Sequence, residues 1–87
     1  MMRISVVQST SQRVTLQVEG EVKGRWVAEL GRACEEALSR DIRLDLDLAD
    51  VSFVDIDGIN LFRALMDRQV TFTNPCPFIA EQLGVSK

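Results

Sequence analysis

Two aspartates and a glycine end an apolar stretch of the chain, Val51-Ser52-Phe53-Val54-Asp55-Ile56-Asp57-Gly58. The residues before Asp55 have the character of core, and the residues from Ile59 to Met66 have helical spacing. A helix N-terminus carries about half a positive charge and unpaired N–H groups, so it suits a carboxylate or another anion. Asp55 and Asp57 are therefore candidates for a helix cap, a catalytic pair or a signalling surface.

The composition removes several kinds of chemistry. The chain contains no histidine, which excludes the commonest general base and any Ser-His or Cys-His nucleophile. Cys34 and Cys76 form no CxxC pair, so a zinc site is not expected, and two reduced thiols are the ordinary state of cytosolic cysteines. The net charge of −3, with scattered basic residues, gives no reason to expect a nucleic-acid partner. We expect no cofactor and no metal.

A divalent-cation site is the alternative use of the many carboxylates, which are Asp45, Asp47, Asp50, Asp55 and Asp57. Hard cations take several oxygen ligands, but this spacing does not follow the pattern of a calcium-binding loop. Alternation places Asp45 and Asp47 on one face of a strand, and Asp50 is expected in a turn. A solvated acidic face is the preferred interpretation.

The elements that must position these carboxylates follow from hydrophobic periodicity. Alternation predicts strands at 4–7, 14–19 and 42–48, and a short strand is expected at 70–73. Helical spacing predicts helices over about 26–38 and 57–68, and Pro77 and Gly84 mark the ends of a third. The order β-β-α-β-α-β-α implies an α/β fold, a small mixed sheet of about four strands packed by three helices.

The chain is expected to form one domain, residues 1–87. No apolar run approaches the ~20 residues that span a bilayer, and the N-terminus lacks a secretory apolar region. We therefore expect a cytoplasmic protein without direct membrane insertion.

The segment from Asp47 to Ile59 resembles the signature of the STAS family, which bacterial anti-sigma-factor antagonists typify. The family pattern is approximately Asp-Leu-Ser-x-Val-x-Phe-Ile-Asp-Ser-Ser-Gly-Leu, and here it is Asp-Leu-Ala-Asp-Val-Ser-Phe-Val-Asp-Ile-Asp-Gly-Ile. The likeness extends to Gly24–Leu30 before the first helix, to Asn74–Ile79, and to the closing Leu83-Gly84-Val85. It thus covers nearly the whole chain and implies a STAS-like fold.

The resemblance also implies a non-enzymatic switch. In the family, a partner kinase phosphorylates the serine before the signature glycine, and phosphorylation breaks the complex. That position is Asp57 here, and Ile56 occupies the position of the other serine. A carboxylate cannot form the phosphoserine ester of this switch, and it carries about one negative charge where phosphoserine carries about 1.5 to 2. Either Asp57 mimics the phosphorylated state, or the protein has no phosphorylation control.

The Asp55-x-Asp57-Gly58 pattern also resembles the nucleophile motif of haloacid-dehalogenase-type phosphatases. In those enzymes the first aspartate attacks phosphorus, the second is the acid/base, and magnesium neutralises charge. Such an enzyme needs a larger core and further acidic and basic residues from later strands, and only 28 residues follow Ile59. An enzyme is therefore not the expected function.

Several side chains near these motifs have more than one possible role. Trp26 is expected to anchor the first helix against the sheet, with a partly exposed interface anchor as the alternative. Cys76 is expected to be structural, although a thiol at a helix N-terminus can become reactive. Phe62, Leu65 and Met66 are expected in the core rather than in a binding groove. Because the helix is apolar around most of its girth, Phe62 or Leu61 is the alternative candidate for its outer face.

We therefore predict a regulatory protein-interaction module, monomeric or weakly homodimeric. The expected partner-binding residues lie in the signature loop and on the following helix: Ser52, Asp55, Ile56, Asp57, Gly58, Asn60, Leu61 and Arg63. The resemblance implies an anti-sigma factor or kinase-like regulator as partner. The alternatives are the ATPase of an ABC-type lipid transporter, with this chain as its STAS subunit, and a chemosensory or two-component system.

Overall fold

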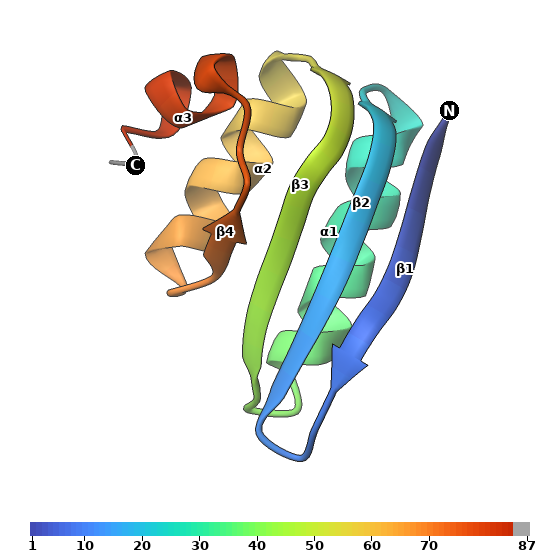
Figure 1. Ribbon diagram of the computed structural model, residues 1–87, viewed down its shortest axis with the longest axis vertical. Coiled ribbons are helices and arrows are strands. Elements are labelled where there is room, and N and C mark those ends of the chain that lie inside the picture. The colour runs from blue at the N-terminus through green and yellow to red at the C-terminus, as the bar shows by residue number, and fades with distance from the viewer. Residues whose placement is uncertain (85–87) are drawn as a thin grey trace.

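In a computed structural model, which describes residues 1–84, the two alternating segments near the N-terminus form the predicted hairpin. Strand β1 (Met2–Ser9) pairs antiparallel with β2 (Arg13–Val22) (Figure 1). The Thr10 hydroxyl closes the turn by accepting hydrogen bonds from the backbone N–H groups of Gln12 and Arg13. Both strands are longer than the alternation predicts, because their pairing runs from Met2 opposite Gly20 to Ser9 opposite Val14.

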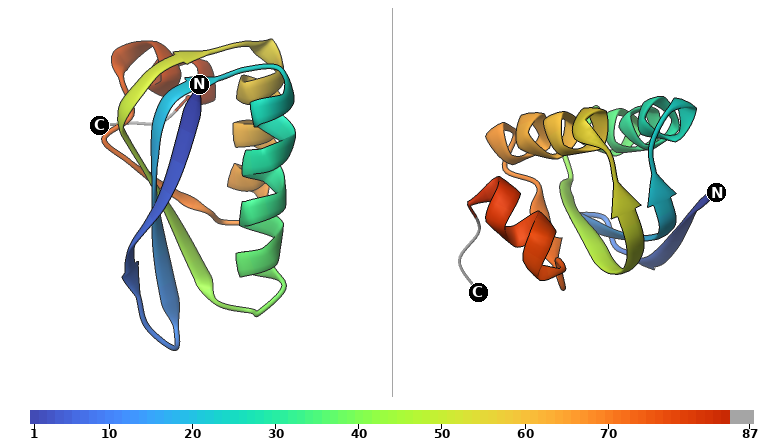
Figure 2. Two further views of the ribbon diagram at one scale, coloured as in Figure 1. Left: turned by 90° about the vertical axis from the view of Figure 1, so that its right-hand side faces the viewer. Right: turned by 90° about the horizontal axis from the view of Figure 1, so that it is seen from above.

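Two crossover helices make the rest of the sheet parallel. Helix α1 (Arg25–Leu38) leads from β2 to β3 (Arg43–Val54), and α2 (Ile56–Asp67) leads from β3 to β4 (Thr71–Thr73). The sheet order is β1-β2-β3-β4, with β2–β3 and β3–β4 parallel. Helices α1 and α2 cover one face of the sheet, and α3 (Pro77–Leu83) lies at the β4 side (Figure 2). The predicted fold class and element order are confirmed.

Strand β3 corrects one part of the prediction. Asp50 lies inside a single twelve-residue strand rather than in a turn between two segments. The register between β2 and β3 shifts twice, and each shift adds one residue to β3. Such bulges change the phase of the alternation. Leu48, Val51 and Val54 are therefore all buried although they are three residues apart, while Phe53 is exposed.

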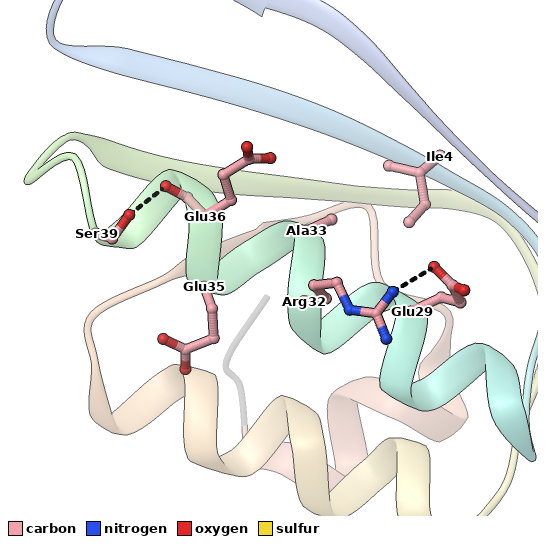
Figure 3. Close-up of a pocket in the computed structure, with 7 residues that line it drawn as sticks. All are labelled: Ile4, Glu29, Arg32, Ala33, Glu35, Glu36 and Ser39. Atoms are coloured by element: carbon pink, nitrogen blue, oxygen red, sulfur yellow. Dashed lines mark hydrogen bonds and ion pairs between the residues drawn. The ribbon is translucent and has the colours of Figure 1, made fainter.

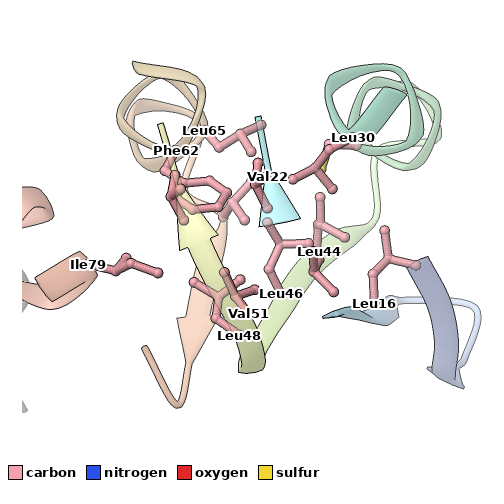
Figure 4. Packing of buried hydrophobic residues seen from close by; sticks show 14 of the residues in the cluster. Leu16, Val22, Leu30, Leu44, Leu46, Leu48, Val51, Phe62, Leu65 and Ile79 are labelled. Atoms are coloured by element: carbon pink, nitrogen blue, oxygen red, sulfur yellow. The ribbon is translucent and has the colours of Figure 1, made fainter. Parts of the chain in front are cut away.

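The core lies between the sheet and the helices α1 and α2 (Figure 4). Phe62 and Leu65 are buried, as predicted, and the Phe62 ring packs 5.5 Å from the ring of Phe72. Ile79 and Leu83 of α3 also face the core, whereas the Phe78 side chain is 54% exposed. Seven residues make only two turns, so α3 buries one narrow stripe and leaves Phe78 outside it.

The opposite face of the sheet is less solvated than the charge pattern predicts. Asp45, on a central strand between β2 and β4, is buried and lies 3.2 Å from the Arg13 guanidinium. Asp47 is half-buried and accepts hydrogen bonds from the Ala49 N–H and the Asn74 amide. The expected solvated acidic face is therefore wrong for Asp45, because neighbouring strands and an arginine cover it.

The last helix begins and ends at the predicted residues. Pro77 is its first residue, and Gly84 caps it with φ of 70°, a left-handed conformation that glycine adopts without strain. Val85, which belongs to the closing part of the family resemblance, lies outside the described residues. Within residues 1–84 no helix is both long enough and apolar enough to cross a bilayer.

Candidate functional site

Asp55 is the N-cap of α2, and its carboxylate joins two strand-to-helix junctions. One carboxylate oxygen, Oδ1, accepts a hydrogen bond from the Gly58 N–H at 2.8 Å. The other, Oδ2, accepts from the Gly24 N–H at 3.1 Å, at the start of α1. The Asp55 N–H itself donates to the Val22 carbonyl at 3.1 Å. Both oxygens are thus held by backbone donors, and Asp55 fixes the β2–α1 junction against the β3–α2 junction.

Gly58 is buried directly beneath this cap. A β-carbon at this position would lie 2.6 Å from the Val54 Cγ1 atom and 3.0 Å from the Val22 carbonyl oxygen. Contacts this short are not tolerated, so the close approach of α2 to β2 and β3 requires a glycine. The signature glycine therefore has a packing role in this chain.

Asp57 has the opposite environment to Asp55. It lies in the first turn of α2 and is exposed. Within residues 1–84 it forms no hydrogen bond and no ion pair through its side chain. A carboxylate in the first turn interacts favourably with the helix dipole. The two carboxylate oxygens of Asp57 nevertheless remain available to a partner.

Two exposed apolar side chains lie close to Asp57 in the sequence. Ile56 is 66% exposed and Phe53 is 50% exposed. The Lys23 ammonium lies 5.9 Å from the centre of the Phe53 ring. Phe53 is not among the predicted site residues, because the alternation of apolar and polar residues does not predict the bulge in β3 that turns its side chain outward. An exposed aromatic next to charged groups is typical of protein interfaces.

A small apolar groove lies beside these residues, between the end of β3 and the start of α3. Its volume is about 310 Å³, and its lining residues are Val51, Ser52, Phe53, Val54, Cys76, Phe78 and Ile79. Phe53 and Phe78 are its exposed aromatic members, and the Cys76 side chain is half-buried. Cys76 precedes the first residue of α3, and its side chain makes no capping hydrogen bond.

The predicted partner-binding residues fall into two groups. Ser52, Ile56, Asp57, Asn60 and Arg63 are exposed at this end of the molecule and along α2, and Arg63 also donates to the Gln82 carbonyl at 3.0 Å. Asp55, Gly58 and Leu61 lie behind this surface. The expectation of an exposed Leu61 is wrong: it is half-buried, with a methyl group 3.5 Å from where a β-carbon on Gly31 would be. The side-by-side packing of α1 and α2 covers it.

The carboxylates do not assemble a cation site in the part of the chain that the structure describes. No three of its acidic or cysteine side chains converge in a way that could hold a metal ion. Asp50 instead accepts a hydrogen bond from the Gln17 amide at 3.1 Å, and Asp45 is paired with Arg13. Asp47 accepts from the Ala49 N–H and the Asn74 amide, and Asp55 and Asp57 have the separate environments described above.

A second hollow, between α1 and β1, is lined by charged residues that pair with one another or with neighbours (Figure 3). Arg32 lies 3.7 Å from Glu29, and Glu35 pairs with Arg68. Trp26, at the start of α1, is half-buried against the core, and the Arg25 guanidinium lies 4.7 Å from the centre of its ring. It anchors α1 against the core, as expected, and it remains partly exposed; the alternative role as an interface anchor stays a prediction.

The arrangement of these elements matches a solved structure described as the anti-sigma factor antagonist SpoIIAA in its unphosphorylated form. The match has a TM-score of 0.79 and covers 97% of this chain and 84% of that chain. The fold is STAS-like. Sequence identity is 16%, so the likeness is one of architecture. A scan against protein-family models and a search of the curated proteins give no match.

Proposed function

We propose that this protein is a non-enzymatic regulatory module that acts by binding a partner protein, in the manner of an anti-sigma-factor antagonist. The observation that carries the proposal is the division of labour between the two aspartates. Both oxygens of Asp55 accept backbone hydrogen bonds and build the loop, whereas Asp57 presents a free charge beside exposed apolar side chains. The STAS-like fold, shared with a protein described as an anti-sigma factor antagonist, supports the same role.

The proposed binding surface consists of the signature loop and the outer side of α2. Ser52, Phe53, Ile56, Asp57 and Asn60 are its exposed members, and Arg63 continues it along the helix. Asp55 and Gly58 support it from behind. The expected partner is an anti-sigma factor or a kinase-like regulator in the cytoplasm, and the ATPase of an ABC-type lipid transporter is the alternative.

Position 57 is proposed to act without phosphorylation. The family resemblance puts the regulated serine at this position, and aspartate has no hydroxyl group to accept a phosphoryl group. Its charge of about −1 is permanent at neutral pH, whereas phosphoserine adds about −1.5 to −2 reversibly. Any control of binding must then come from another residue or from the partner.

The phosphatase alternative is disfavoured by the same geometry. An attacking carboxylate oxygen must be free to reach phosphorus, but each oxygen of Asp55 already accepts a backbone N–H. We expect no magnesium-dependent hydrolysis of p-nitrophenyl phosphate. Hydrolysis that disappears in the Asp55→Asn variant would overturn the proposal of a binding module.

Partner capture with variants of position 57 tests the proposal. The tagged protein is used to recover partners from the source cells, and the affinity of the purified partner is then measured by calorimetry. Asp57→Lys should weaken binding by about tenfold or more, because reversing the charge at position 57 would place like charges opposite each other in the interface. Asp57→Ser separates the two roles: tighter binding means that Asp57 mimics phosphoserine, and weaker binding means that it contacts the partner directly.

Asp67→Lys is the matched control, since Asp67 is exposed at the other end of the same helix. Its binding should equal that of the unmodified protein. Equal binding by all the position 57 variants would show that the surface is wrongly placed. The identity of the recovered protein distinguishes an anti-sigma regulator from a transporter ATPase.

A further inference from the structure

We propose that the edge formed by the two strand-to-helix junctions also docks onto the same edge of a second copy of this chain, in a weak dimer with two-fold symmetry. A two-fold interface is self-complementary, so a residue on one side of the axis meets a different residue of the other copy. This edge carries opposite charges on its two sides and apolar side chains beside them, which is the arrangement that such an interface needs.

The opposite charges are placed by the Asp55 carboxylate. Lys23 directly precedes Gly24, and Asp57 directly precedes Gly58. The N–H groups of these two glycines bind the two oxygens of Asp55, at 3.1 and 2.8 Å. Lys23 and Asp57 are therefore attached to two junctions that a single carboxylate holds together. Rotation by 180° about an axis between the junctions places Lys23 of each copy opposite Asp57 of the other copy.

The charged groups on both sides are accessible. Asp57 has no ion pair among residues 1–84, and neither has Arg25, which adds a second exposed cation beside Lys23. The only ion pair of Lys23 within this range is with Glu21, at 3.5 Å, and the Lys23 side chain is half-exposed. Exposed ion pairs contribute little stability, so exchanging Glu21 for Asp57 of the second copy costs little.

Apolar burial supplies the attraction. Phe53 and Ile56 are 50% and 66% exposed and both belong to the β3–α2 junction, which also carries Asp57, and the Lys23 ammonium of the other junction lies 5.9 Å from the centre of the Phe53 ring. A copy seated on this edge would cover both side chains on each chain, and burial of apolar area is favourable by about 25 cal/mol per Å². The patch is much smaller than the roughly 20 to 30 residues per side of a stable interface, so the expected Kd is on the order of 0.1–1 mM.

The dimer itself does not depend on the proposed function, but its effect on partner binding does. The dimer would cover Phe53, Ile56 and Asp57, which belong to the proposed partner-binding surface. Self-association and partner binding would then compete, and high local concentration of the protein would reduce the fraction that can bind a partner.

Sedimentation and NMR dilution series of the full chain, from about 1 mM to about 20 µM, test the dimer in the concentration range expected for it. The unmodified protein should show concentration-dependent amide shifts at residues 23–26 and 53–58. Asp57→Lys and the double variant Lys23→Glu/Arg25→Glu should each weaken association at least tenfold. An equimolar mixture of these two variants should associate again. In the mixed dimer, the basic edge of the first variant faces the acidic edge of the second variant on both sides of the axis. A folding defect cannot produce this recovery.

Arg43→Glu combined with Asp67→Lys makes charge reversals of the same kind at exposed sites outside the edge, and it should leave association unchanged. A protein that is monomeric at about 1 mM, or a mixture that does not recover, would overturn the dimer and leave the proposed function intact. The free edge of β1, where Val6 and Val7 are 63% and 53% exposed, is the competing interface. Association that Val6→Lys abolishes and the junction variants do not would assign the dimer to β1 and overturn the proposal.

Discussion

Two residues of the same type, two positions apart, have different roles at the residue scale. Asp55 accepts hydrogen bonds from backbone donors of two junctions, one of which lies 31 residues away from it in the sequence, while Asp57 faces solvent. A helix cap contributes about 0.5–2 kcal/mol, and a hydrogen bond to a charged group contributes about 1.5–3 kcal/mol. The carboxylate that supports the fold is therefore distinct from the one that we propose for partner binding.

Urea unfolding of single variants checks this separation. Asp55→Ala should lower the free energy of unfolding by about 2 kcal/mol, because it removes a cap and the link to Gly24. Asp57→Ala should change it by at most about 0.5 kcal/mol, since only a favourable first-turn charge is lost. Equal destabilisation by the two substitutions would contradict the roles assigned to them.

At the scale of elements, the placement of α2 depends on Gly58, and Gly31 of α1 has different surroundings. Gly58 lets the start of α2 approach Val54 and Val22, where a β-carbon would clash at 2.6 Å. Gly31 lies in the middle of α1, where a β-carbon would meet only a Leu61 methyl group, at an ordinary 3.5 Å. Arg63 adds a further link by donating to the last turn of α3.

Alanine at each glycine gives a matched pair of variants. Gly58→Ala should destabilise the protein by about 1–3 kcal/mol, because the core must shift to admit the methyl group. Gly31→Ala should stabilise it by about 0.5–1 kcal/mol, since alanine favours the helix interior and fits the available space. Thermal and urea unfolding measure both. Stabilisation by Gly58→Ala would show that α2 is not held against β2 as described.

At the scale of the whole molecule, one core joins the sheet to both crossover helices, and Cys34 of α1 is buried in it. Burial disfavours the thiolate and raises the pKa of Cys34 from 9.0 to about 12. The folded protein thus retains a thiol proton that the unfolded chain loses above about pH 9. The stability from this group is complete below that pH and is lost as the pH rises toward 12.

Thiol labelling and unfolding at several pH values test the integrity of this core. In the native protein at pH 8, iodoacetamide should modify the half-buried Cys76 and spare Cys34, and urea should expose both. Between about pH 8 and pH 10.5 the unmodified protein should lose more stability than Cys34→Ala, which lacks the ionising group. Rapid labelling of Cys34 in the native state would mean that the core opens locally.

The sequence by itself determined the order and type of the elements, the capping role available at Asp55, and the ends of α3 at Pro77 and Gly84. These features depend on neighbours two to four residues apart, which periodicity and cap residues report directly. The resemblance of the signature segment also predicts that Asp57 stands at the position of the family's serine, and this stays a prediction. Each of these inferences is local in the chain.

Only the tertiary structure decided which of these side chains meet. The bulges of β3 turn Phe53 outward, the neighbouring strands bury Asp45, and α1 covers Leu61. The second hydrogen bond of Asp55 reaches Gly24, and it arises because parallel pairing brings the ends of β2 and β3 together. Contacts between residues this far apart depend on strand register and helix packing, and the pattern within any one segment carries no record of either.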